Sequence, residues 1–316
     1  MKKNFKLIKK NDRDLLLNGM KHIPVLLDET VDGLEIHSGE LVVDGTLGGG
    51  GHTLAILDKF GKSVKIICLD LDLDAISRVK REIKDKDFDV IFVNEGFQDL
   101  DEVLDKIDVK GVDKILLDLG ISSFQLEESG RGFTFQKDEP LLMTMKKNLK
   151  EDDLTARDIV NTWDEKTLAD IIYGFGEEKF SRRIAKEIVV SRKKKPIETT
   201  FDLVEIIDRA VGRLYRGKKI NMSTRTFQAL RIATNSELSN LEKVIEKGFD
   251  SLRSGGRMAI ITFHSLEDRI VKKAFNALKE KGYAKIINKK PITPSEEELK
   301  SNPRSRSAKL RLIEKI

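Results

Sequence analysis

The residues best suited to ligand chemistry begin with a glycine-rich turn at residues 44–52, which reads Asp-Gly-Thr-Leu-Gly-Gly-Gly-Gly-His. Glycines let a backbone approach a ligand closely, and the first N–H groups of a following helix stay free to bind it. The turn lacks the Lys-Ser/Thr pair of a P-loop, which argues against a nucleoside triphosphate ligand. Many α/β folds contain such a turn, so it needs a second element beside it.

Asp70 supplies that second element, because it ends the next apolar run about 20 residues beyond the glycines. An acid at this spacing and at a strand end can accept hydrogen bonds from ribose hydroxyls. The alternative is a capping or turn aspartate, but the spacing and the strand-end position together favour the ribose role. The two elements fit either NAD or S-adenosylmethionine.

Three further positions bear on the choice of cofactor. Asp44, at the end of the first apolar run, could hold the amine of an amino acid group beside the glycines. Phe97 follows the third run, where an aromatic ring can pack against adenine or can simply join the core. Asp118 ends the fourth run, at the edge where open α/β sheets bind their ligands. The first of these positions favours S-adenosylmethionine.

These residues depend on a parallel sheet to bring them together. Strands are expected where short, nearly continuous apolar runs occur, at 41–46, 65–70, 89–94, 114–120, 257–263, 284–288 and 308–314. Such runs are typical of strands that are covered on both faces. Helical patterns at 52–60, 73–86 and 98–107 separate the first four runs, and this alternation predicts βαβ units.

About 100 residues of mostly helical pattern separate the fourth strand from the fifth, and loops of that length rarely lack a role of their own. We therefore expect an inserted helical domain. The predicted organisation is a basic N-terminal extension at 1–21, a sheet domain in two parts at 22–135 and 223–316, and a helical insertion at 136–222 that recognises the substrate.

Composition limits the classes of function that remain. The 316 residues carry 58 Lys plus Arg against 53 Asp plus Glu, and no apolar run approaches the roughly 20 residues of a membrane span. The N-terminal segment has too short an apolar stretch for a secretion signal. The single cysteine, Cys68, excludes an intramolecular disulfide, and the four histidines are not spaced as metal ligands. We expect a cytoplasmic protein without a metal site or a membrane partner.

Positive charge is concentrated in a few segments. Residues 179–195 contain eight Lys or Arg and one acid, and the tail beyond 300 adds more. Such clusters suit a polyphosphate partner such as RNA, although a solvated helix face gives the same pattern.

Several segments match one family in order. They are His-Ile-Pro-Val-Leu-Leu-Asp-Glu at 22–29, the glycine-rich turn, Leu-Asp-Leu-Gly-Ile-Ser-Ser-Phe-Gln at 117–125, Tyr-Gly-Phe-Gly-Glu-Glu-Lys-Phe-Ser-Arg-Arg-Ile-Ala at 173–185, Thr-Arg-Thr-Phe-Gln-Ala-Leu-Arg-Ile at 224–232, Phe-His-Ser-Leu-Glu-Asp-Arg at 263–269 and Asn-Pro-Arg-Ser-Arg-Ser-Ala-Lys-Leu-Arg at 302–311. With them the chain resembles the bacterial 16S rRNA cytosine-N4 methyltransferases (MraW/RsmH type).

The resemblance implies a Rossmann-like class I methyltransferase sheet with an inserted helical domain. It also implies S-adenosylmethionine-dependent methylation of the exocyclic N4 amine of a cytidine in the decoding region of 16S rRNA, within the small ribosomal subunit. The cofactor contacts carried over are Gly50, Gly51, His52, Asp70, Phe97, Asp118 and Gln125. Of these, His52 and Gln125 rest on the resemblance alone. The oligomeric state stays open, with a homodimer as one possibility.

Two residues are candidates for catalysis. Asp118 stands where other amino-methyltransferases place an acid or an amide, but the Pro-Pro-aromatic sequence that usually follows is missing here. His264 follows the fifth strand and could orient the base or relay a proton, or could be a structural histidine bonded to a turn. Candidates for contacts with rRNA phosphates are Arg182, Arg183, Arg225 and Arg231, each of which could instead form a salt bridge within the helical insertion.

One block departs from the family pattern. The family typically reads Asp-Gly-Pro-Leu-Asp-Met-Arg-Met-Asp, whereas residues 138–146 read Asp-Glu-Pro-Leu-Leu-Met-Thr-Met-Lys; in addition, Asn221 replaces a usual histidine. These changes suggest a divergent second member of the family. The alternative hypothesis is an assembly factor that binds S-adenosylmethionine and RNA with weakened or altered activity. A DNA amino-methyltransferase is a poorer third option, since its characteristic motif is absent.

Overall fold

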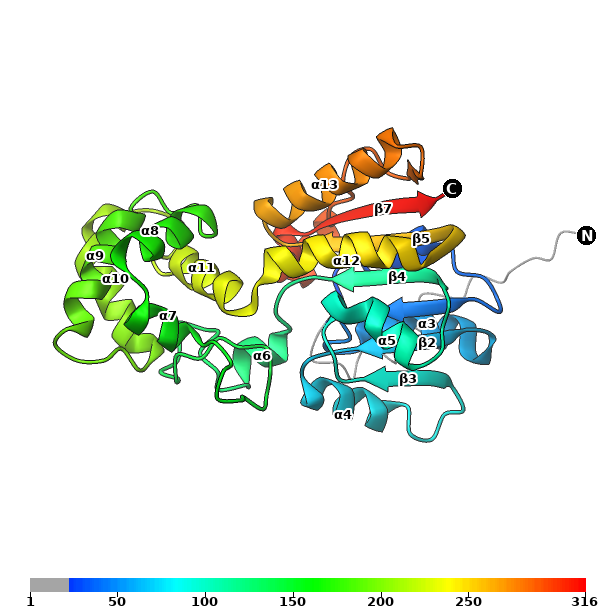
Figure 1. The fold of residues 1–316 in the computed structure, drawn as a ribbon, viewed down its shortest axis with the longest axis horizontal. Coiled ribbons are helices and arrows are strands. Elements are labelled where there is room, and N and C mark those ends of the chain that lie inside the picture. Colours follow the sequence, from blue (N-terminus) through cyan, green and yellow to red (C-terminus); the bar gives the residue numbers. More distant parts are fainter. Residues whose placement is uncertain (1–22) are drawn as a thin grey trace, which may run out of the picture.

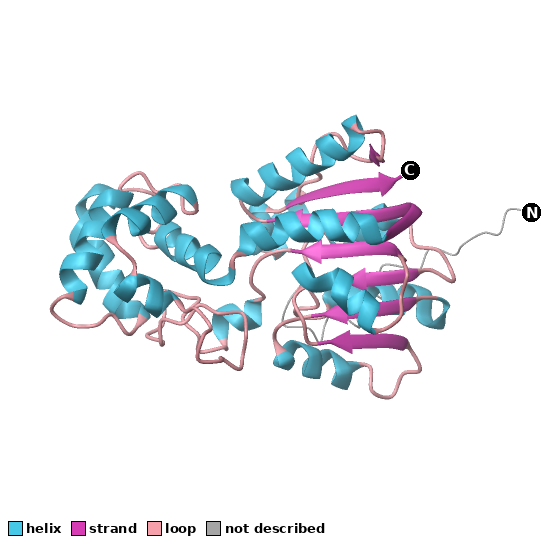
Figure 2. Cartoon of the chain, viewed as in Figure 1, coloured by secondary structure: helices cyan, strands magenta, loops and turns pink. Residues whose placement is uncertain are grey.

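The computed structural model describes residues 23–316, so the basic extension expected at 1–21 lies outside the described residues. Two lobes lie side by side along the long axis of the molecule, one a sheet flanked by helices and the other a group of helices (Figures 1 and 2). Within the described range, every helix is too short or too polar to cross a membrane.

All seven expected strands are present in one sheet with the order β3-β2-β1-β4-β5-β7-β6. They are β1 (Leu41–Asp44), β2 (Lys65–Leu69), β3 (Asp89–Val93), β4 (Val112–Asp118), β5 (Leu252–Thr262), β6 (Ala284–Ile286) and β7 (Lys309–Lys315). β1 to β5 pair in parallel, and β7 runs antiparallel to both of its neighbours. This is the sheet of class I methyltransferases, and the predicted fold is confirmed.

The strands are apolar throughout because both faces of the sheet are covered. Val43 and Ile67 point into a core on one face, while Val42 and Ile66, their neighbours along the strands, point into a core on the other. The first core is completed by α5 (Leu100–Lys106), α12 (Glu237–Ser251) and α13 (Ser265–Glu280). The second is completed by α2 (Leu27–Leu34), α3 (Gly51–Phe60) and α4 (Leu73–Glu82).

The helical lobe has a core of its own. It is built from α7 (Ala156–Thr162), α8 (Glu165–Gly174), α9 (Ser181–Arg192), α10 (Thr200–Tyr215) and α11 (Thr224–Asn235). Capping boxes begin α7 at Thr155 and α10 at Thr199, where a hydroxyl and an acid three residues later satisfy free N–H groups. The core also contains Phe133 and Phe227, which lie outside the 136–222 range expected for the insertion.

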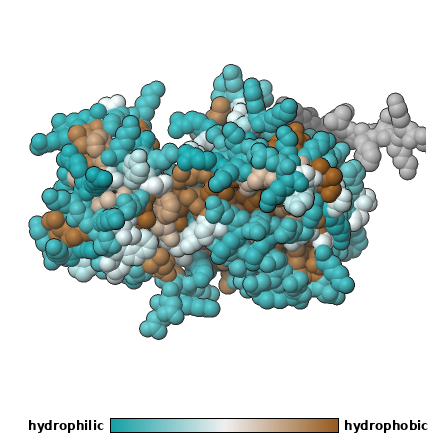
Figure 3. Space-filling model, turned by 45° about the horizontal axis from the view of Figure 1, so that its top comes forward, coloured by the Kyte–Doolittle hydropathy of each residue, from teal (hydrophilic) through white to brown (hydrophobic). Residues whose placement is uncertain are grey.

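The two lobes are joined by the chain and by contacts across the gap. A short helix, α6 (Ser123–Glu127), follows β4, and Ser236 in a left-handed conformation (φ 50°) separates α11 from α12. Glu177 of the helical lobe, also left-handed, accepts a hydrogen bond of 3.0 Å from the Ser265 hydroxyl and lies 3.5 Å from Arg269. In Figure 3, apolar side chains gather along the hollow between the lobes.

Candidate active site

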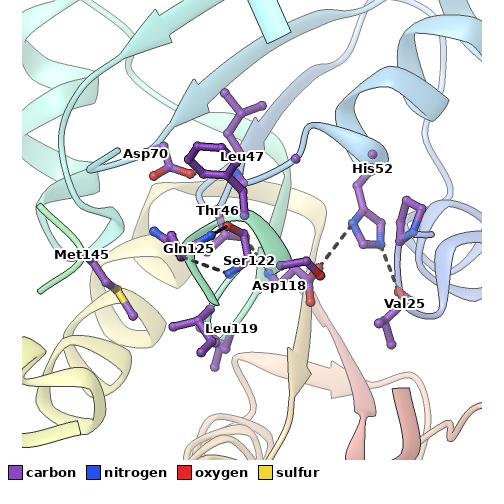
Figure 4. Close-up of a pocket in the computed structure, with 18 of the residues that line it drawn as sticks. Val25, Thr46, Leu47, His52, Asp70, Asp118, Leu119, Ser122, Gln125 and Met145 are labelled. Atoms are coloured by element: carbon purple, nitrogen blue, oxygen red, sulfur yellow. Dashed lines mark hydrogen bonds and ion pairs between the residues drawn. The ribbon is translucent and has the colours of Figure 1, made fainter. Parts of the chain in front are cut away.

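A cavity of about 900 Å³ opens at the carboxyl edge of the parallel strands. Residues that follow β1, β2 and β4 line it, as does the junction between α11 and α12. Figure 4 shows Asp70, Gln125 and Asp118 converging on this space from different elements. Six of the seven expected cofactor contacts line the cavity: Gly51, His52, Asp70, Phe97, Asp118 and Gln125.

The seventh expected residue, Gly50, lies behind the cavity wall and shapes the glycine turn. Its φ is 79°, and a Cβ there would come within 2.4 Å of Val79 Cγ2, so only glycine fits. Gly48 is also left-handed (φ 49°), and Gly49 has open space where a Cβ would stand. The turn therefore leaves bare backbone facing the cavity at the first residues of α3.

Asp44 does not take the ligand-holding position suggested by the sequence. It is buried beneath the turn, where its carboxylate accepts hydrogen bonds of 2.6 Å from the Thr53 hydroxyl and 3.1 Å from Thr46 N, and it does not line the cavity. Burial raises the pKa of Asp44. Asp44 ends an apolar run, and this position predicts an acid that is open to a ligand. In the structure, the glycine turn folds back over its side chain.

Asp70 and Phe97 lie where the sequence predicted. The Asp70 carboxylate accepts hydrogen bonds from Gly48 N at 2.7 Å and Asp72 N at 2.8 Å, so it links the glycine turn to the start of α4. Burial raises the pKa of Asp70 to about 6. Phe97 lines the cavity and also packs against the core under α5 and α12, so one ring meets the cavity and the core together.

Gln125 is held by its own helix start. In the capping box that begins α6, Gln125 Oε1 accepts a hydrogen bond of 3.0 Å from Ser122 N, and the Ser122 hydroxyl accepts one from Gln125 N. The side-chain oxygen is thus engaged, and the amide nitrogen remains for the cavity. Phe124 beside it stacks under the Arg78 guanidinium, whose centre lies 3.9 Å from the ring centroid.

Asp118 is the most unusual group in the cavity. Its backbone N–H donates to the Thr46 hydroxyl at 2.6 Å, which fixes the end of β4 against the glycine turn. Its side-chain oxygen Oδ1 is buried and has no hydrogen-bond partner among the described residues. Burial, and then the nearby charges of Asp44 and Glu267, raise the pKa of Asp118 to about 8. A buried acceptor without a donor indicates a place for a ligand's N–H or O–H group.

His52 stands behind Asp118 rather than in the open part of the cavity. The imidazole is 5% exposed, its Nε2 lies 3.2 Å from the Val25 carbonyl oxygen, and its Nδ1 lies 3.7 Å from Asp118 Oδ2 (Figure 4). Burial lowers the pKa of His52 to about 4, so the ring is neutral at pH 7. The side chain therefore faces the candidate catalytic acid, and its backbone begins α3 beside the glycines.

His264 makes local contacts of the kind expected for a structural histidine, which is the alternative to a role in catalysis. It caps α13, where its Nδ1 accepts a hydrogen bond of 3.4 Å from Glu267 N, and it does not line the cavity. With Glu237 and Glu267 it forms a group of three potential metal ligands, which sequence spacing did not predict because the residues come from separate helix starts. Arg231 donates hydrogen bonds of 2.8 Å to both carboxylate oxygens of Glu237, so the negative charge of Glu237 is already paired with a guanidinium.

The four arginines proposed as RNA contacts fall into two kinds. Arg182 and Arg183 are exposed at the start of α9 and form no ion pair within residues 23–316. Arg225 lies 3.9 Å from buried Glu178, and Arg231 is held by Glu237. Arg225 and Arg231 therefore have internal ion-pair partners, which is the alternative to contacts with RNA phosphates.

Several residues line the cavity in addition to the site residues expected from the sequence: Arg78, Met145, Asn235, Glu237, Asn240 and Glu267. Most come from the junction of the lobes, which no local pattern reveals. Asn235 holds Met145 in place, since its side chain accepts from Met145 N at 2.8 Å and donates to the Met143 carbonyl at 2.7 Å. Met145 belongs to the 138–146 block that departs from the family pattern.

A family model and the relatives most similar in sequence agree on one family. Residues 19–316 match the model of the MraW methylase family. A ribosomal RNA small subunit methyltransferase H from Clostridium botulinum (strain Kyoto / Type A2) is 46% identical over 311 residues, which cover 94% of this chain and 99% of that protein. The protein of the same name from Lachnospira eligens is 43% identical, with 94% and 98% covered. A solved rRNA methylase from Streptococcus thermophilus has a TM-score of 0.42 and 14% identity, with 93% and 99% covered. The chain belongs to the MraW methylase family.

Proposed function

We propose that this chain is a cytoplasmic enzyme that methylates the exocyclic N4 amine of a cytidine in the decoding region of 16S rRNA, with S-adenosylmethionine as donor. The names of its relatives support an rRNA of the small subunit as the substrate. The observation that carries the proposal is the buried, unpartnered Oδ1 of Asp118 at the edge of the glycine turn. An amine that donates a hydrogen bond there would satisfy it.

The residues around the cavity fit S-adenosylmethionine. Asp70 would bind the ribose hydroxyls, Phe97 would pack against adenine, and the glycine turn with Gln125 would hold the amino acid half. Gly50 must be glycine because a Cβ there would meet Val79, and the open space at Gly49 leaves room for a ligand against the backbone. When bound, the cofactor supplies an electrophilic methyl group.

The chain's own contribution is to orient the amine and to exclude water. A cytosine amine is a poor nucleophile because its lone pair is conjugated with the ring, so alignment supplies much of the rate. Asp118 Oδ1 would accept a hydrogen bond from the amine and stabilise the positive charge that develops on nitrogen. Leu119 and Phe263 line the same part of the cavity and would shield it from solvent. The target base must leave its stack to enter, as in other base-modifying enzymes.

The altered loop favours this function over the binding-factor alternative. Residues 139, 142, 144 and 146 differ from the family pattern, yet none of them lines the cavity. Glu139 instead accepts a hydrogen bond of 2.9 Å from Gly132 N, and Thr144 is buried. The methionine that does line the cavity, Met145, matches the family pattern. The substitutions therefore change the support of the loop rather than the surface that faces the substrate.

The direct test is transfer of labelled methyl groups to 30S subunits from a strain that lacks the modification, followed by nucleoside analysis. We expect labelled N4-methylcytidine, at least 100-fold less with Asp118→Ala, and a raised Michaelis constant for the cofactor with Asp70→Ala. Tight cofactor binding without label in any nucleoside would contradict the proposal and favour the assembly factor. Light scattering on the purified protein measures its oligomeric state and so tests whether it is a homodimer.

A further inference from the structure

The contact between His52 and Asp118 is unusual because both facing atoms are acceptors. The Val25 carbonyl can only accept, so the hydrogen of the neutral imidazole must sit on Nε2, 3.2 Å away. This leaves a bare lone pair on Nδ1, which lies 3.7 Å from Asp118 Oδ2. Two acceptors that face each other in a buried place repel unless a proton lies between them.

Asp118 is the group on which that proton can reside. His52 is enclosed and its ring donates to a neutral carbonyl, so burial lowers its pKa to about 4. Asp44 and Glu267 are the acids nearest to Asp118, and a negative charge on either of them disfavours a negative charge on Asp118. The neutral acid is therefore the form that this environment stabilises at pH 7.

We propose that His52 is a positioning residue for the reaction: its Nδ1 accepts the hydrogen of the neutral Asp118 acid at Oδ2, and Oδ1 is thereby kept free as the acceptor for the substrate amine. The inference rests on the proposed function. The Nδ1–Oδ2 distance of 3.7 Å is too long for a hydrogen bond as it stands. A small rotation of the Asp118 carboxyl group closes this distance, and this rotation needs neither cofactor nor RNA.

Without His52, the acid proton could sit on either oxygen. A proton on Oδ1 would make this oxygen a donor that faces the hydrogens of the substrate amine. The two donors would repel, and the amine would lose its alignment with the methyl group. Asparagine at position 118 would reproduce the neutral acid, with an amide N–H toward His52 and an oxygen toward the cavity. The proposal therefore predicts an unusual result, in which an amide replaces a catalytic acid with partial activity.

Two substitutions of His52 separate positioning from a purely structural role. His52→Gln can keep a donor for the Val25 carbonyl but removes the acceptor at the Nδ1 position. His52→Asn can keep an acceptor near that position but removes the hydrogen bond to Val25. We expect kcat to fall about tenfold further in His52→Gln than in His52→Asn, with the cofactor Michaelis constant similar in both. A structural role for the histidine predicts the reverse order, and that order would overturn the proposal.

The matched pair at position 118 is the second arm. We expect Asp118→Asn to retain at least ten times the kcat of Asp118→Ala, since only the asparagine offers both the donor and the acceptor. Equal loss in both variants would mean that the ionised carboxylate is required, which contradicts the proposal. Each variant is first checked for folding by its thermal unfolding.

A third arm needs neither cofactor nor RNA. In protein labelled with ¹⁵N at histidine, the Nδ1 signal of His52 should show a hydrogen bond at pH 6 and move toward the value of a free acceptor at pH 9 or in Asp118→Ala. An Nδ1 signal that is the same in wild type and Asp118→Ala would overturn the proposal. If wild type labels no nucleoside while the Nδ1 signal responds as expected, the proposed function fails and the shared proton stands.

Discussion

The carboxyl groups at the edge of the sheet are held in an environment that favours their neutral forms. Asp44 is 1% exposed, and burial raises its pKa together with those of Asp70 and Asp118. Burial makes the ionised form of each of these acids costly for the folded protein. Their presence at one place is typical of a site where function, rather than packing, has selected the residues.

The raised pKa of Asp118 makes a prediction for stability. The unfolded chain releases this proton near pH 4, whereas the folded protein keeps it up to about pH 8, so the free energy of unfolding falls as the pH rises through that window. We expect Asp118→Asn to remove this loss and to be more stable than wild type by up to about 5 kcal/mol at pH 8.5, but not at pH 4. Urea unfolding at both pH values measures it.

Two features make that comparison specific. His52 acts in the opposite direction between its lowered pKa of about 4 and the ordinary value, and it is present in both proteins, so it cancels to first order. Asp152→Asn at an exposed site is the matched control for the loss of one carboxyl group. A stability gain of Asp118→Asn that is the same at pH 4 and 8.5 would show that the carboxyl titrates normally.

At the scale of elements, the sheet could be predicted from the sequence because each strand is a short, nearly continuous apolar run between turns. The predicted strands also locate the residues that follow them, so Asp70, Phe97 and Asp118 could be assigned to the carboxyl edge of the sheet from the sequence. The cavity residues Asn235 and Glu237 could not, because they meet the sheet only through the left-handed turn at Ser236.

The helical core was less predictable for a related reason. Phe135 and Phe227 pack edge to face with ring centroids 5.4 Å apart, although 91 intervening residues separate them in the sequence. No periodic pattern within one segment encodes such a contact. The range of 136–222 expected for the insertion is based on the change from a strand pattern to a helix pattern. Such a pattern carries no information on the long-range contacts that complete the core of the helical lobe.

One arginine connects the loop at 138–146 to Asp70. Arg131 donates 2.7 Å hydrogen bonds to the Met145 carbonyl and to the carboxylate of buried Asp72, whose N–H holds Asp70. Breaking a buried ion pair leaves an uncompensated charge, so we expect Arg131→Gln to lower the free energy of unfolding by about 3 kcal/mol. We also expect it to weaken cofactor binding. Urea unfolding and titration calorimetry measure the two effects.

The matched control lies next to this pair. Lys147 and Asp74 also join the loop to α4 at 2.7 Å, but both side chains are at least 40% exposed. Lys147→Gln should therefore cost less than about 1 kcal/mol and leave the cofactor affinity unchanged. Equal effects of the two substitutions would mean that Arg131 contributes only as another surface charge.

At the scale of the whole molecule, the modest net charge of +5 conceals an uneven distribution. Arg182 and Arg183 begin α9 only a few residues after Glu177, which contacts α13 across the gap between the lobes. These exposed cations therefore lie close along the chain to the contact between the two lobes. RNA bound there would have its backbone on the helical lobe and a base directed toward Asp118.

This arrangement predicts how RNA binding responds to salt. Removing one cation that binds a phosphate should reduce the slope of log affinity against log salt by about one unit. We expect the double variant Arg182→Ala/Arg183→Ala to lower the slope by roughly 1.5 to 2 units, with cofactor affinity unchanged. Arg231→Gln should leave the slope unchanged, because Glu237 already neutralises that guanidinium, and should instead reduce stability.

The control must remove equal charge elsewhere. Lys84 and Lys86 are exposed in the loop between α4 and β3, at the amino ends of the strands and so away from the cavity. Their double alanine variant keeps the same net charge as the α9 variant, and any long-range effect of charge alone would appear in both. If the two double variants reduce the slope equally, RNA senses only the total charge of the protein. A reduction confined to the α9 variant would instead make the helical lobe the surface that delivers the base to the sheet.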